Sequence, residues 1–349
     1  MKILGIETSC DETAVAVVDD NRNILAHNVL SQLEEHQPYG GVVPEIAARA
    51  HLDHLDGLVI KTMKEAGITY DQLDGIAATA GPGLIGGVMV GLMTAKALAL
   101  ATNKPLIAIN HLEAHALTAR LTNEIELPFL LLLVSGGHCQ LLRVEDIGQY
   151  ELLGQTIDDA VGEAFDKVAK MMGLPYPGGP HLEKLLVGAN PEAAAQIDLP
   201  RPLLKKKHAD FSFAGLKTAV RQFIGTRTLS DQEKADLSLA FHQCVAEILV
   251  DRLAQSLKMI DTRTIRTLVV AGGVAANQYL CRELKTFCDS RNLTMASPPI
   301  ALCTDNAAMI AWAGIEKLRR GESDDMLVAA RPRWPLHSPA AQAPVGETK

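Results

Sequence analysis

The chain has 349 residues, of which 48% are apolar and 21% charged, which is the balance of a globular protein with room for two domains. Its net charge of −8 excludes a basic surface over the whole protein, so any nucleic-acid site has to be a local patch. The 6 cysteines are scattered without a CxxC pair, which argues against a disulfide framework or a zinc ribbon and favours a reducing cytoplasm.

The first predicted element is a β-hairpin. Apolar runs at 3–8 and 13–18 predict two strands, joined by the polar turn Ser-Cys-Asp-Glu at 9–12. Because the first strand begins at the start of the chain, no signal peptide is predicted. Asp11 and Glu12 in the turn are candidate acid–base groups, although a plain polar turn would use the same residues.

Two helices are predicted next, at 45–66 after a proline and at 84–101, which is rich in alanine and glycine. The sequence Gly-Pro-Gly-Leu-Ile-Gly at 81–86 matches the GxGxxG fingerprint of dinucleotide-binding folds. No acidic residue follows between 87 and 112 to bind a ribose, so close helix packing explains the glycines better. The chain has no GxxxxGK[ST] phosphate-binding loop, and its longest apolar run, 83–95, is too short to span a membrane, which takes about 20 residues.

A His-Leu-Glu-Ala-His sequence places His111 and His115 four residues apart, so on a helix both imidazoles lie on one face and can bind one metal ion. Asp305, at the start of a later predicted helix, is a candidate third ligand, with a helix N-cap as the alternative. The zinc-protease signature HExxH requires glutamate directly after the first histidine, where Leu112 stands, and Glu113 comes one residue late. A protease site is therefore disfavoured.

A second hairpin is predicted from strands at 129–134 and 139–144 around the turn Ser-Gly-Gly-His at 135–138. Because it repeats the form of the first hairpin, the chain is predicted to contain two related α/β halves. The amides of such a glycine turn can converge on a phosphate. Helices are predicted at 158–172 and 231–258.

Charged residues cluster after the second hairpin. On the helix predicted at 158–172, Asp159 and Asp166 share a face, whereas Asp158 is expected to be solvated. The segment 173–213 is rich in Pro, Gly and Lys and is predicted to be irregular and exposed. A candidate RNA-binding patch, with a solvated loop as the alternative, consists of Arg201, Lys205, Lys206, Lys207, Lys217 and Arg221.

The C-terminal third contains a strand at 268–270, the sequence Ala-Gly-Gly-Val-Ala-Ala-Asn at 271–277 and helices at 275–290 and 306–320. A strand, a glycine pair and a helix start can enclose an adenosine and offer a helix N-terminus to a phosphate. The residues after 336 are predicted to be a disordered tail.

Nine motifs, spread over almost the whole chain, together resemble the tRNA N6-adenosine threonylcarbamoyltransferase family in its bacterial form. The resemblance does not depend on any one of them. They are GIETSCDET at 5–13, GPGL at 81–84, HLEAH at 111–115, LVSGGH at 133–138, DDAVGEAFDK at 158–167, YPGGP at 176–180, DFSFAGLK at 210–217, GGVAAN at 272–277 and CTDN at 303–306.

The resemblance implies an α/β fold of two ribonuclease-H-like domains, as in the sugar kinase, chaperone ATPase and actin superfamily, around a nucleotide cleft. The first domain is expected at 1–108 together with 305–336. The second is expected at 109–304, with a helical and basic insertion near 155–230, and the predicted disordered tail is 337–349.

The implied activity is transfer of a threonylcarbamoyl group from threonylcarbamoyl-AMP to N6 of the adenosine 3′ of the anticodon. The implied substrates are tRNAs that read codons starting with adenine, and AMP is released. His111, His115 and Asp305 would bind one divalent metal, iron(II) in preference to zinc. The residues implied to hold the donor are Leu133, Val134, Ser135, Gly136, Gly137, Asp166, Gly179 and Asn277.

Asp11, ahead of Glu12, is the expected base that takes the proton of the adenosine amine. The family also implies two protein partners, a smaller paralogue and a P-loop ATPase. The ATPase partner agrees with the missing phosphate-binding loop in this chain. No association with a membrane is implied. The expected tRNA contacts are Lys205, Lys206, Lys207 and Lys217.

Three other functions stay open from the residues alone. A small-molecule kinase or ATP-driven chaperone module on the same fold predicts ATP hydrolysis without RNA. A scaffold that only docks partners through the helices at 45–66 and 84–101 predicts that His111→Ala is harmless. A metalloprotease predicts casein cleavage that stops with a chelator.

Overall fold

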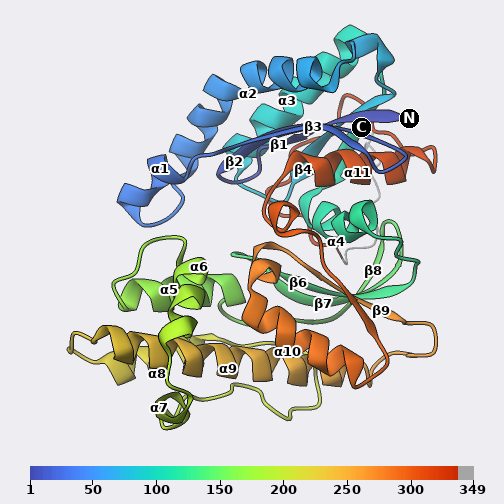
Figure 1. Cartoon of the computed structure of the whole chain (residues 1–349). Coiled ribbons are helices and arrows are strands. Elements are labelled where there is room, and N and C mark those ends of the chain that lie inside the picture. The colour runs from blue at the N-terminus through green and yellow to red at the C-terminus, as the bar shows by residue number, and fades with distance from the viewer. Residues whose placement is uncertain (337–349) are drawn as a thin grey trace, which may run out of the picture. The chain divides into compact units, whose positions relative to one another are not determined.

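The computed structural model describes residues 1–336, and the chain divides into two compact units, each with its own five-stranded sheet (Figure 1). Unit 1 comprises residues 1–122, 145–151 and 305–336. Unit 2 comprises residues 123–144 and 152–304. The tail predicted to be disordered, 337–349, lies outside the described residues.

Unit 1 is built on a sheet with the strand order β3-β2-β1-β4-β5. β1, β2 and β3 are antiparallel neighbours, whereas β1, β4 and β5 run parallel to one another. Apolar side chains fill both faces of the central strands, as expected where helices cover a sheet on both sides. The strands are β1 Lys2–Glu7, β2 Glu12–Asp19, β3 Ile24–Ser31, β4 Gly75–Gly81 and β5 Leu106–Asn110.

Helices cover both faces of this sheet. Figure 1 shows α2 and α3 on one face, and α4 with α11 on the other. Strand β5 runs directly into α4, so the sheet fixes where that helix begins. The helices of the unit are α1 Leu33–His36, α2 Pro44–Ala66, α3 Ile85–Thr102, α4 His111–Thr122 and α11 Ala307–Leu318.

Helix α3 packs closely on the sheet near its start, where glycines leave no room for a Cβ. A Cβ at Gly87 would lie 2.3 Å from the carbonyl oxygen of Thr8, and a Cβ at Gly83 would lie 2.6 Å from Cβ of Ser9. Close packing therefore accounts for the glycines at the start of this helix, as predicted. Among the described residues, α3 is the one helix whose length and composition would suit a membrane span, and 33% of it is buried.

Unit 2 repeats this topology. Its sheet has the order β10-β9-β6-β7-β8. When its strands are numbered in chain order within the unit and read from β8, they come third, second, first, fourth and fifth, as the strands of unit 1 do. β6 pairs antiparallel with β7 and parallel with β9. The two related α/β halves predicted from the hairpins are thereby confirmed. The strands are β6 Phe129–Val134, β7 Cys139–Asp146, β8 Gln149–Gln155, β9 Thr267–Ala271 and β10 Thr294–Ala296.

The helices of unit 2 pack around the long helix α9. Ser230 caps α9 in a capping box with Glu233, so the predicted start at residue 231 is confirmed. The apolar faces of α9 and its neighbours form the core of the unit with the inner face of the sheet. The helices are α5 Val161–Met171, α6 Gly178–Leu185, α7 Pro191–Ala195, α8 Ala214–Ile224, α9 Asp231–Ser256 and α10 Gln278–Asp289.

Asp158 has a different role from the one predicted. Helix α5 begins at Val161, so Asp158 precedes the helix and is not on its solvated face. Its Oδ1 accepts hydrogen bonds from the amides of Phe213 and Ala214, at 2.8 and 3.2 Å. The Ser212 hydroxyl donates to its other oxygen at 2.5 Å. Asp158 therefore ties the start of α8 to the segment before α5.

The segment 173–213 was predicted to be irregular, which is wrong for α6 and α7. Asn190 caps α7 and Pro191 occupies its first turn, so a proline there starts the helix. The expected domain boundary after residue 108 also differs from the observed one after Thr122, because α4 packs against α11 within unit 1.

Candidate active site

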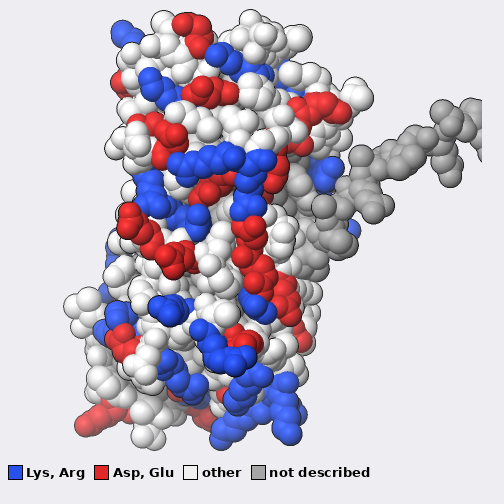
Figure 2. All heavy atoms as spheres, turned by 90° about the vertical axis from the view of Figure 1, so that its right-hand side faces the viewer, with Lys and Arg blue, Asp and Glu red and all other residues white. Residues whose placement is uncertain are grey.

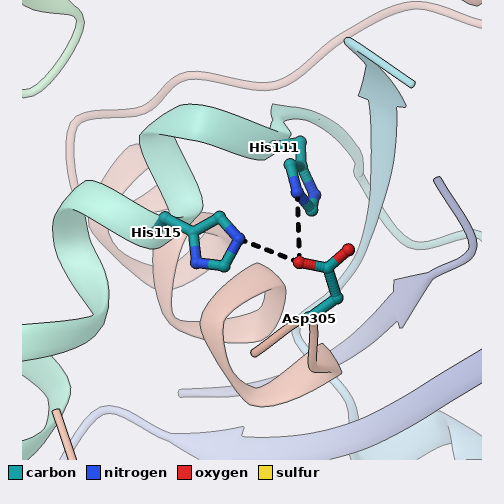
Figure 3. A group of neighbouring side chains, drawn as sticks. All are labelled: His111, His115 and Asp305. Carbon is teal, nitrogen blue, oxygen red and sulfur yellow. Dashed lines mark hydrogen bonds and ion pairs between the residues drawn. The ribbon is translucent and has the colours of Figure 1, made fainter. Parts of the chain in front are cut away.

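Two histidines and an aspartate converge in unit 1 (Figure 3). His111 and His115 occupy the start of α4, and Asp305 lies just before α11. Nε2 of His115 lies 3.0 Å from Oδ1 of Asp305, and Nε2 of His111 lies 3.4 Å from the same oxygen. The three potential ligand atoms lie within 4.8 Å of one another, so the group predicted from the sequence is brought together.

Two asparagines hold the helices that carry these residues. Oδ1 of Asn110 accepts the amide of Leu112 at 2.9 Å at the start of α4. Oδ1 of Asn306 accepts the amide of Met309 at 3.0 Å and caps α11. Because Asn306 is the N-cap, Asp305 is not needed for that role, and its carboxylate is directed at the histidines.

The donor atoms suit a divalent transition metal. Ligands about 2.1 Å from a tetrahedrally coordinated ion lie roughly 3.4 Å apart. The observed separations of 3.0 and 3.4 Å between the histidine nitrogens and the aspartate oxygen are close to that value. Two imidazoles and one carboxylate with open positions are found around both iron(II) and zinc.

A buried carboxylate orients His111 from the side opposite Asp305. Oε2 of Glu7 accepts a hydrogen bond from Nδ1 of His111 at 3.0 Å, and the hydroxyl oxygen of Ser9 lies 3.1 Å from the same nitrogen. Glu7 is fully buried at the end of β1, where the Thr79 hydroxyl and the Ser9 amide also donate to it. With its Nδ1–H directed at Glu7, His111 keeps the lone pair of Nε2 for a metal.

The charges of these groups stabilise one another. Burial opposes ionisation of Asp305, but the charge of His111 and hydrogen bonds from both histidines hold the pKa of this carboxyl far below its usual range. Burial also favours the neutral form of His111, but Asp305 and Glu7 raise its pKa well above the ordinary value. A metal ion held by His111, His115 and Asp305 would take the place of the imidazolium proton, so its binding would release a proton.

Glu113, which stands one residue too late for the protease signature, forms its hydrogen bonds away from His111, His115 and Asp305. Its Oε1 accepts hydrogen bonds from the amide of Gly148 at 3.0 Å and from the hydroxyl of Tyr150 at 2.8 Å. Burial and the charge of Glu113 raise the pKa of Tyr150 well above its ordinary value, so this phenol stays a donor. Glu113 therefore anchors α4 to the β7–β8 turn, and its position gives no support to a protease mechanism.

The two expected acid–base residues lie in the same unit, Asp11 in the first hairpin turn and Glu12 at the start of β2. Burial, the negative charges of Asp305 and Asp11, and a hydrogen bond with Asp11 raise the pKa of Glu12 well above its usual range. The anion of Glu12 is therefore disfavoured, whereas a general base acts from its unprotonated form. Burial raises the pKa of the Cys10 thiol in the same turn, so this cysteine is not an activated nucleophile. Asp11 is the better candidate base.

The residues expected to hold the donor all lie in unit 2, where contacts connect them into a ring. Leu133 and Val134 end β6 and are buried. The following turn is closed by hydrogen bonds from the Ser135 amide to the His138 carbonyl, at 2.8 Å, and from the His138 amide to the Ser135 hydroxyl, at 3.1 Å. The Gly162 amide donates to the Ser135 carbonyl at 3.2 Å and ties the turn to α5.

Asp166 and Glu183 continue the ring. Asp166 lies on α5, one turn after Gly162. Its Oδ1 accepts a hydrogen bond from the amide of Gly178 at 2.7 Å. Gly178 and Gly179 are the first two residues of α6. Oε1 of Glu183, on α6, accepts the amide of Gln278 at 2.6 Å at the start of α10. Hydrogen bonds therefore lead from the glycine turn through α5 and α6 to α10.

Asn277, at the start of α10, completes the ring, because Ala271, shortly before it in the chain, pairs with Leu133 in the sheet. Its Oδ1 caps the helix by accepting the amide of Leu280 at 3.0 Å, and its Nδ2 donates to Nε2 of His242 at 3.1 Å. Nδ1 of His242 donates to the carbonyl of Ser238 at 2.8 Å, which leaves Nε2 as the acceptor. Burial lowers the pKa of His242 to about 4, so its ring is neutral at physiological pH. His242 thus fixes which way the Asn277 amide points.

The glycines of this ring fall into two groups. At Gly272 φ is 92° and a Cβ would lie 2.4 Å from the Val134 carbonyl oxygen, so the fold itself requires glycine there. At Gly136, Gly137 and Gly179, a Cβ would meet no heavy atom of residues 1–336 within 4 Å. Open space surrounds these three expected donor contacts, and a ligand can approach their backbone closely.

The 205–207 lysine loop is exposed, but its backbone is firmly held. The amide of Lys205 donates to a carboxylate oxygen of Asp251 at 3.0 Å. The buried guanidinium of Arg252 donates to the Lys206 carbonyl at 3.2 Å and pairs with Asp251. Three cationic side chains are therefore presented on a fixed backbone in unit 2.

Lys217 differs from these lysines because it is already paired. Its Nζ lies 2.6 Å from Oδ2 of Asp159, and Nζ of Lys167 lies 2.8 Å from Oδ1 of the same residue. Asp159 precedes α5, so the prediction that it shares a helix face with Asp166 is wrong. Asp159 instead links α5 to α8 through the two lysines.

Glu7 and His242, the residues that orient His111 and Asn277, were not predicted from the sequence. Glu7 had a visible signal, because it is an acidic residue at the end of an otherwise apolar buried strand. His242 had none, because polar residues on the buried face of a long amphipathic helix are not distinguished by spacing alone.

Proteins of one family resemble this chain in sequence over most of its length. The model of a family described as tRNA N6-adenosine threonylcarbamoyltransferase matches residues 23–312. A protein of that name from Paramagnetospirillum magneticum is 58% identical over 340 residues, which cover 96% of this chain and 97% of that protein. The identity therefore extends over nearly the full length of both proteins.

Solved structures share the fold at low sequence identity. HypF from T. kodakarensis matches with a TM-score of 0.62 and 13% identity, over 91% of this chain and 48% of that one. A ROK hexokinase from Thermus thermophilus matches with a TM-score of 0.50 and 16% identity, over 92% of this chain and 99% of that one. The predicted α/β fold of two halves with related topology is confirmed and is shared with these structures. By family match and by sequence identity, the chain belongs to the tRNA N6-adenosine threonylcarbamoyltransferase family, whose members are tRNA-modifying transferases.

Proposed function

We propose that this enzyme transfers the threonylcarbamoyl group from threonylcarbamoyl-AMP to N6 of the adenosine 3′ of the anticodon, and releases AMP. The substrates are tRNAs that read codons starting with adenine. The observation that carries the proposal is the convergence of His111, His115 and Asp305 on one point. The ring of contacts among the expected donor-binding residues of unit 2 supports it.

Catalysis of this reaction depends chiefly on positioning the donor and the adenosine amine. The donor is a mixed carbamoyl–phosphate anhydride and is already activated, but the exocyclic amine of adenosine is a poor nucleophile because its lone pair is delocalised into the ring. Holding both reactants in an attack geometry contributes several kcal/mol, with ~7–11 kcal/mol as the upper range. Charge that develops on the leaving phosphate has to be stabilised as well.

One divalent ion, iron(II) in preference to zinc, would be held by His111, His115 and Asp305. When bound there, it would supply Lewis-acid stabilisation of developing negative charge. Glu7 and Ser9 keep His111 in the orientation that ligation needs.

The donor would be held in unit 2 by backbone and side-chain groups of the contact ring. The turn Ser135, Gly136 and Gly137 offers amides to the phosphate, and no Cβ blocks the approach. The Asp166 carboxylate is anchored to the chain through one oxygen and can accept a donor hydroxyl through the other. The Asn277 amide, fixed by His242, presents a constant hydrogen-bonding edge.

Asp11 would take the proton from the attacking amine, since burial and nearby negative charges raise the pKa of Glu12 and disfavour its anion. The tRNA would be bound through phosphates by the exposed 205–207 lysine loop. On the face shown in Figure 2, Lys and Arg alternate with Asp and Glu, so a local contact of this kind suits the net charge of −8. Lys217 contributes less, because its ammonium is paired with Asp159.

Two protein partners follow from the same proposal. The chain has no GxxxxGK[ST] loop, so a separate P-loop ATPase would serve the cycle. A smaller paralogue would bind the exposed apolar side chains of α2 and α3, because water-facing apolar clusters mark interaction surfaces. The exposed side chains of these two helices are Leu52, Ile60, Ile85, Met89, Met93 and Leu100.

All six cysteines are free thiols, which supports the cytoplasm as the site of action.

The test is a reconstituted reaction. The chain, its two partners, threonine, bicarbonate, ATP and unmodified tRNA are incubated, and the digested tRNA is analysed by mass. We expect threonylcarbamoyladenosine from a tRNA with adenosine 3′ of the anticodon, and none from the same tRNA with guanosine there. Absence of the modified nucleoside, or equal yield from both tRNAs, would contradict the proposal.

A further inference from the structure

A chain of buried polar side chains connects the start of α2 to the first hairpin turn. Its members are Thr13, Gln32, His36 and His51, each with an exposed fraction of 0%. They come from β2, the segment before α1, the end of α1 and the middle of α2, all within unit 1. Four polar groups buried together this completely have to satisfy one another.

The two ends of this chain are backbone groups with fixed roles. At one end, the amide of Val43 donates to Nδ1 of His36 at 3.3 Å. At the other end, Nε2 of His51 lies 3.0 Å from the carbonyl oxygen of Cys10, which can only accept. An amide proton at one end and a carbonyl oxygen at the other determine the direction of every hydrogen bond between them.

His51 is therefore protonated on Nε2, and its Nδ1 is an acceptor. The hydroxyl of Thr13 lies 2.8 Å from that Nδ1 and donates to it. Nε2 of Gln32 donates to the Thr13 hydroxyl oxygen at 3.3 Å and lies 3.2 Å from the same imidazole nitrogen. Oε1 of Gln32 then accepts from Nε2 of His36 at 3.2 Å, which agrees with the acceptor role of His36 Nδ1.

The network holds both carbonyl groups in the middle of the hairpin turn. His51 donates to the Cys10 carbonyl, and the backbone amide of Gln32 donates to the Asp11 carbonyl at 3.0 Å. From the other side, a Cβ at Gly87 would lie 3.0 Å from Nε2 of His51, so α3 leaves just enough room for the ring. Burial lowers the pKa of His51, in agreement with a neutral imidazole.

We propose that His51 is a positioning residue: through the Thr13–Gln32–His36 network it fixes the backbone of the Cys10–Asp11 turn, and so the place from which the Asp11 carboxylate reaches the adenosine amine. This inference rests on the proposed function, since it gives Asp11 a substrate. His51 itself does not touch the reacting atoms. It sets the geometry of the group that does, and a misplacement of about 1 Å costs as much as 100-fold in rate.

The test compares His51→Leu, which removes the donor to the Cys10 carbonyl, with His51→Gln, whose amide can restore it. His54→Leu is the matched control, because it makes the same substitution at an exposed site on the same helix. Single-turnover transfer from preformed threonylcarbamoyl-AMP to tRNA, donor affinity, and hydrogen exchange of the amides at 10–13 are measured for the full chain with saturating partners.

We expect His51→Leu to lower the transfer rate roughly 10- to 100-fold, to speed exchange at 10–13 and to leave donor affinity unchanged. We expect His51→Gln to recover most of the rate, and His54→Leu to match the wild type. The inference is overturned if His51→Leu transfers at the wild-type rate, or if rate and donor affinity fall together.

A measurement on the wild type covers the case in which His51→Leu does not fold. Nitrogen-15 spectra of the imidazoles should find His51 and His36 both neutral and protonated on Nε2, and a His51 protonated on Nδ1 would contradict the network. If the wild type itself transfers nothing from the preformed donor, the proposed function fails, while the exchange and tautomer results still decide whether His51 holds the turn.

Discussion

Glu7 and His111 form a buried carboxylate–imidazole pair, with Oε2 of Glu7 3.0 Å from Nδ1 of His111, although 104 positions separate them in the chain. The pair joins the end of β1 to the start of α4. Because Nδ1 of His111 is occupied by Glu7, its Nε2 is left to face Asp305. Burial raises the pKa of Glu7, but the charge of His111 lowers it, and the lowering effect is the larger. Glu7 is therefore an anion that accepts this hydrogen bond.

Glu7→Gln should weaken metal binding without removing a ligand. The amide cannot accept the Nδ1 proton as an anion does, so His111 loses its fixed tautomer, and affinity should fall roughly 10- to 100-fold. Competition titration with a coloured chelator measures this on the isolated chain. Glu45→Gln, an exposed glutamate paired with Arg49, is the control. Equal affinities for wild type and Glu7→Gln would show that the pair does not support the metal site.

Asp11→Ala should separate donor binding from transfer. Because the residues expected to hold the donor lie in unit 2, the variant should bind threonylcarbamoyl-AMP as the wild type does. Transfer should fall by roughly 100-fold or more, the contribution of a positioned base. Isothermal titration with the donor and single-turnover transfer are the two measurements. A parallel loss of both would remove the base assignment from Asp11.

The buried His242 predicts a specific loss of stability in acid. Its pKa is about 4 in the folded protein, against an ordinary value of 6.5, so between these values the unfolded chain binds a proton that the folded chain does not. Stability should therefore fall as pH drops from about 6.5 to about 4, by about 3 kcal/mol for this residue.

Urea unfolding at a series of pH values from about 7 to about 4 checks the His242 prediction. His242→Gln cannot take up a proton, so its stability should fall less steeply over this interval than that of the wild type. His54→Gln, at an exposed position, should keep the wild-type slope. Superimposable pH curves for wild type and His242→Gln would mean that the imidazole is not held neutral.

The 205–207 lysine loop should carry part of the salt dependence of tRNA binding. Neutralising all three residues with alanine should reduce the slope of log affinity against log salt by roughly 2 to 3. Lys217→Ala is the comparison, because its ammonium is paired with Asp159 and should contribute less to the slope. Filter binding at several salt concentrations measures both. An unchanged slope in the triple variant would exclude the loop from the RNA contact.

The parts of the fold that sequence predicted are those with a local cause. The two hairpins were visible because apolar runs are interrupted by short turns of small or polar residues, and both are present as β1–β2 and β6–β7. The pair His111 and His115 was visible because residues four apart share a helix face. Asp305, 190 positions from His115, was proposed because it stands where a later helix begins, and spacing could not place it beside the histidines.

The parts that sequence missed depend on partners far along the chain. Asp158 looked like a solvated helix residue because its hydrogen-bonding partner Phe213 lies 55 positions later. The same holds for His242 and Asn277, 35 positions apart, since only the packed helices α9 and α10 bring them together. Helices α6 and α7 were missed because proline and glycine suggest loops, although proline at a first turn begins a helix.

The most direct test of the account is single-turnover transfer from preformed threonylcarbamoyl-AMP to unmodified tRNA, because this step requires neither threonine nor ATP. The metal-loaded wild type is predicted to form threonylcarbamoyladenosine and AMP in equal amounts. Asp305→Ala is predicted to form neither, while Asp325→Ala, at an exposed aspartate of the same unit, behaves as the wild type. Product formation by Asp305→Ala at the wild-type rate would contradict the assignment of His111, His115 and Asp305 as the metal centre of the reaction.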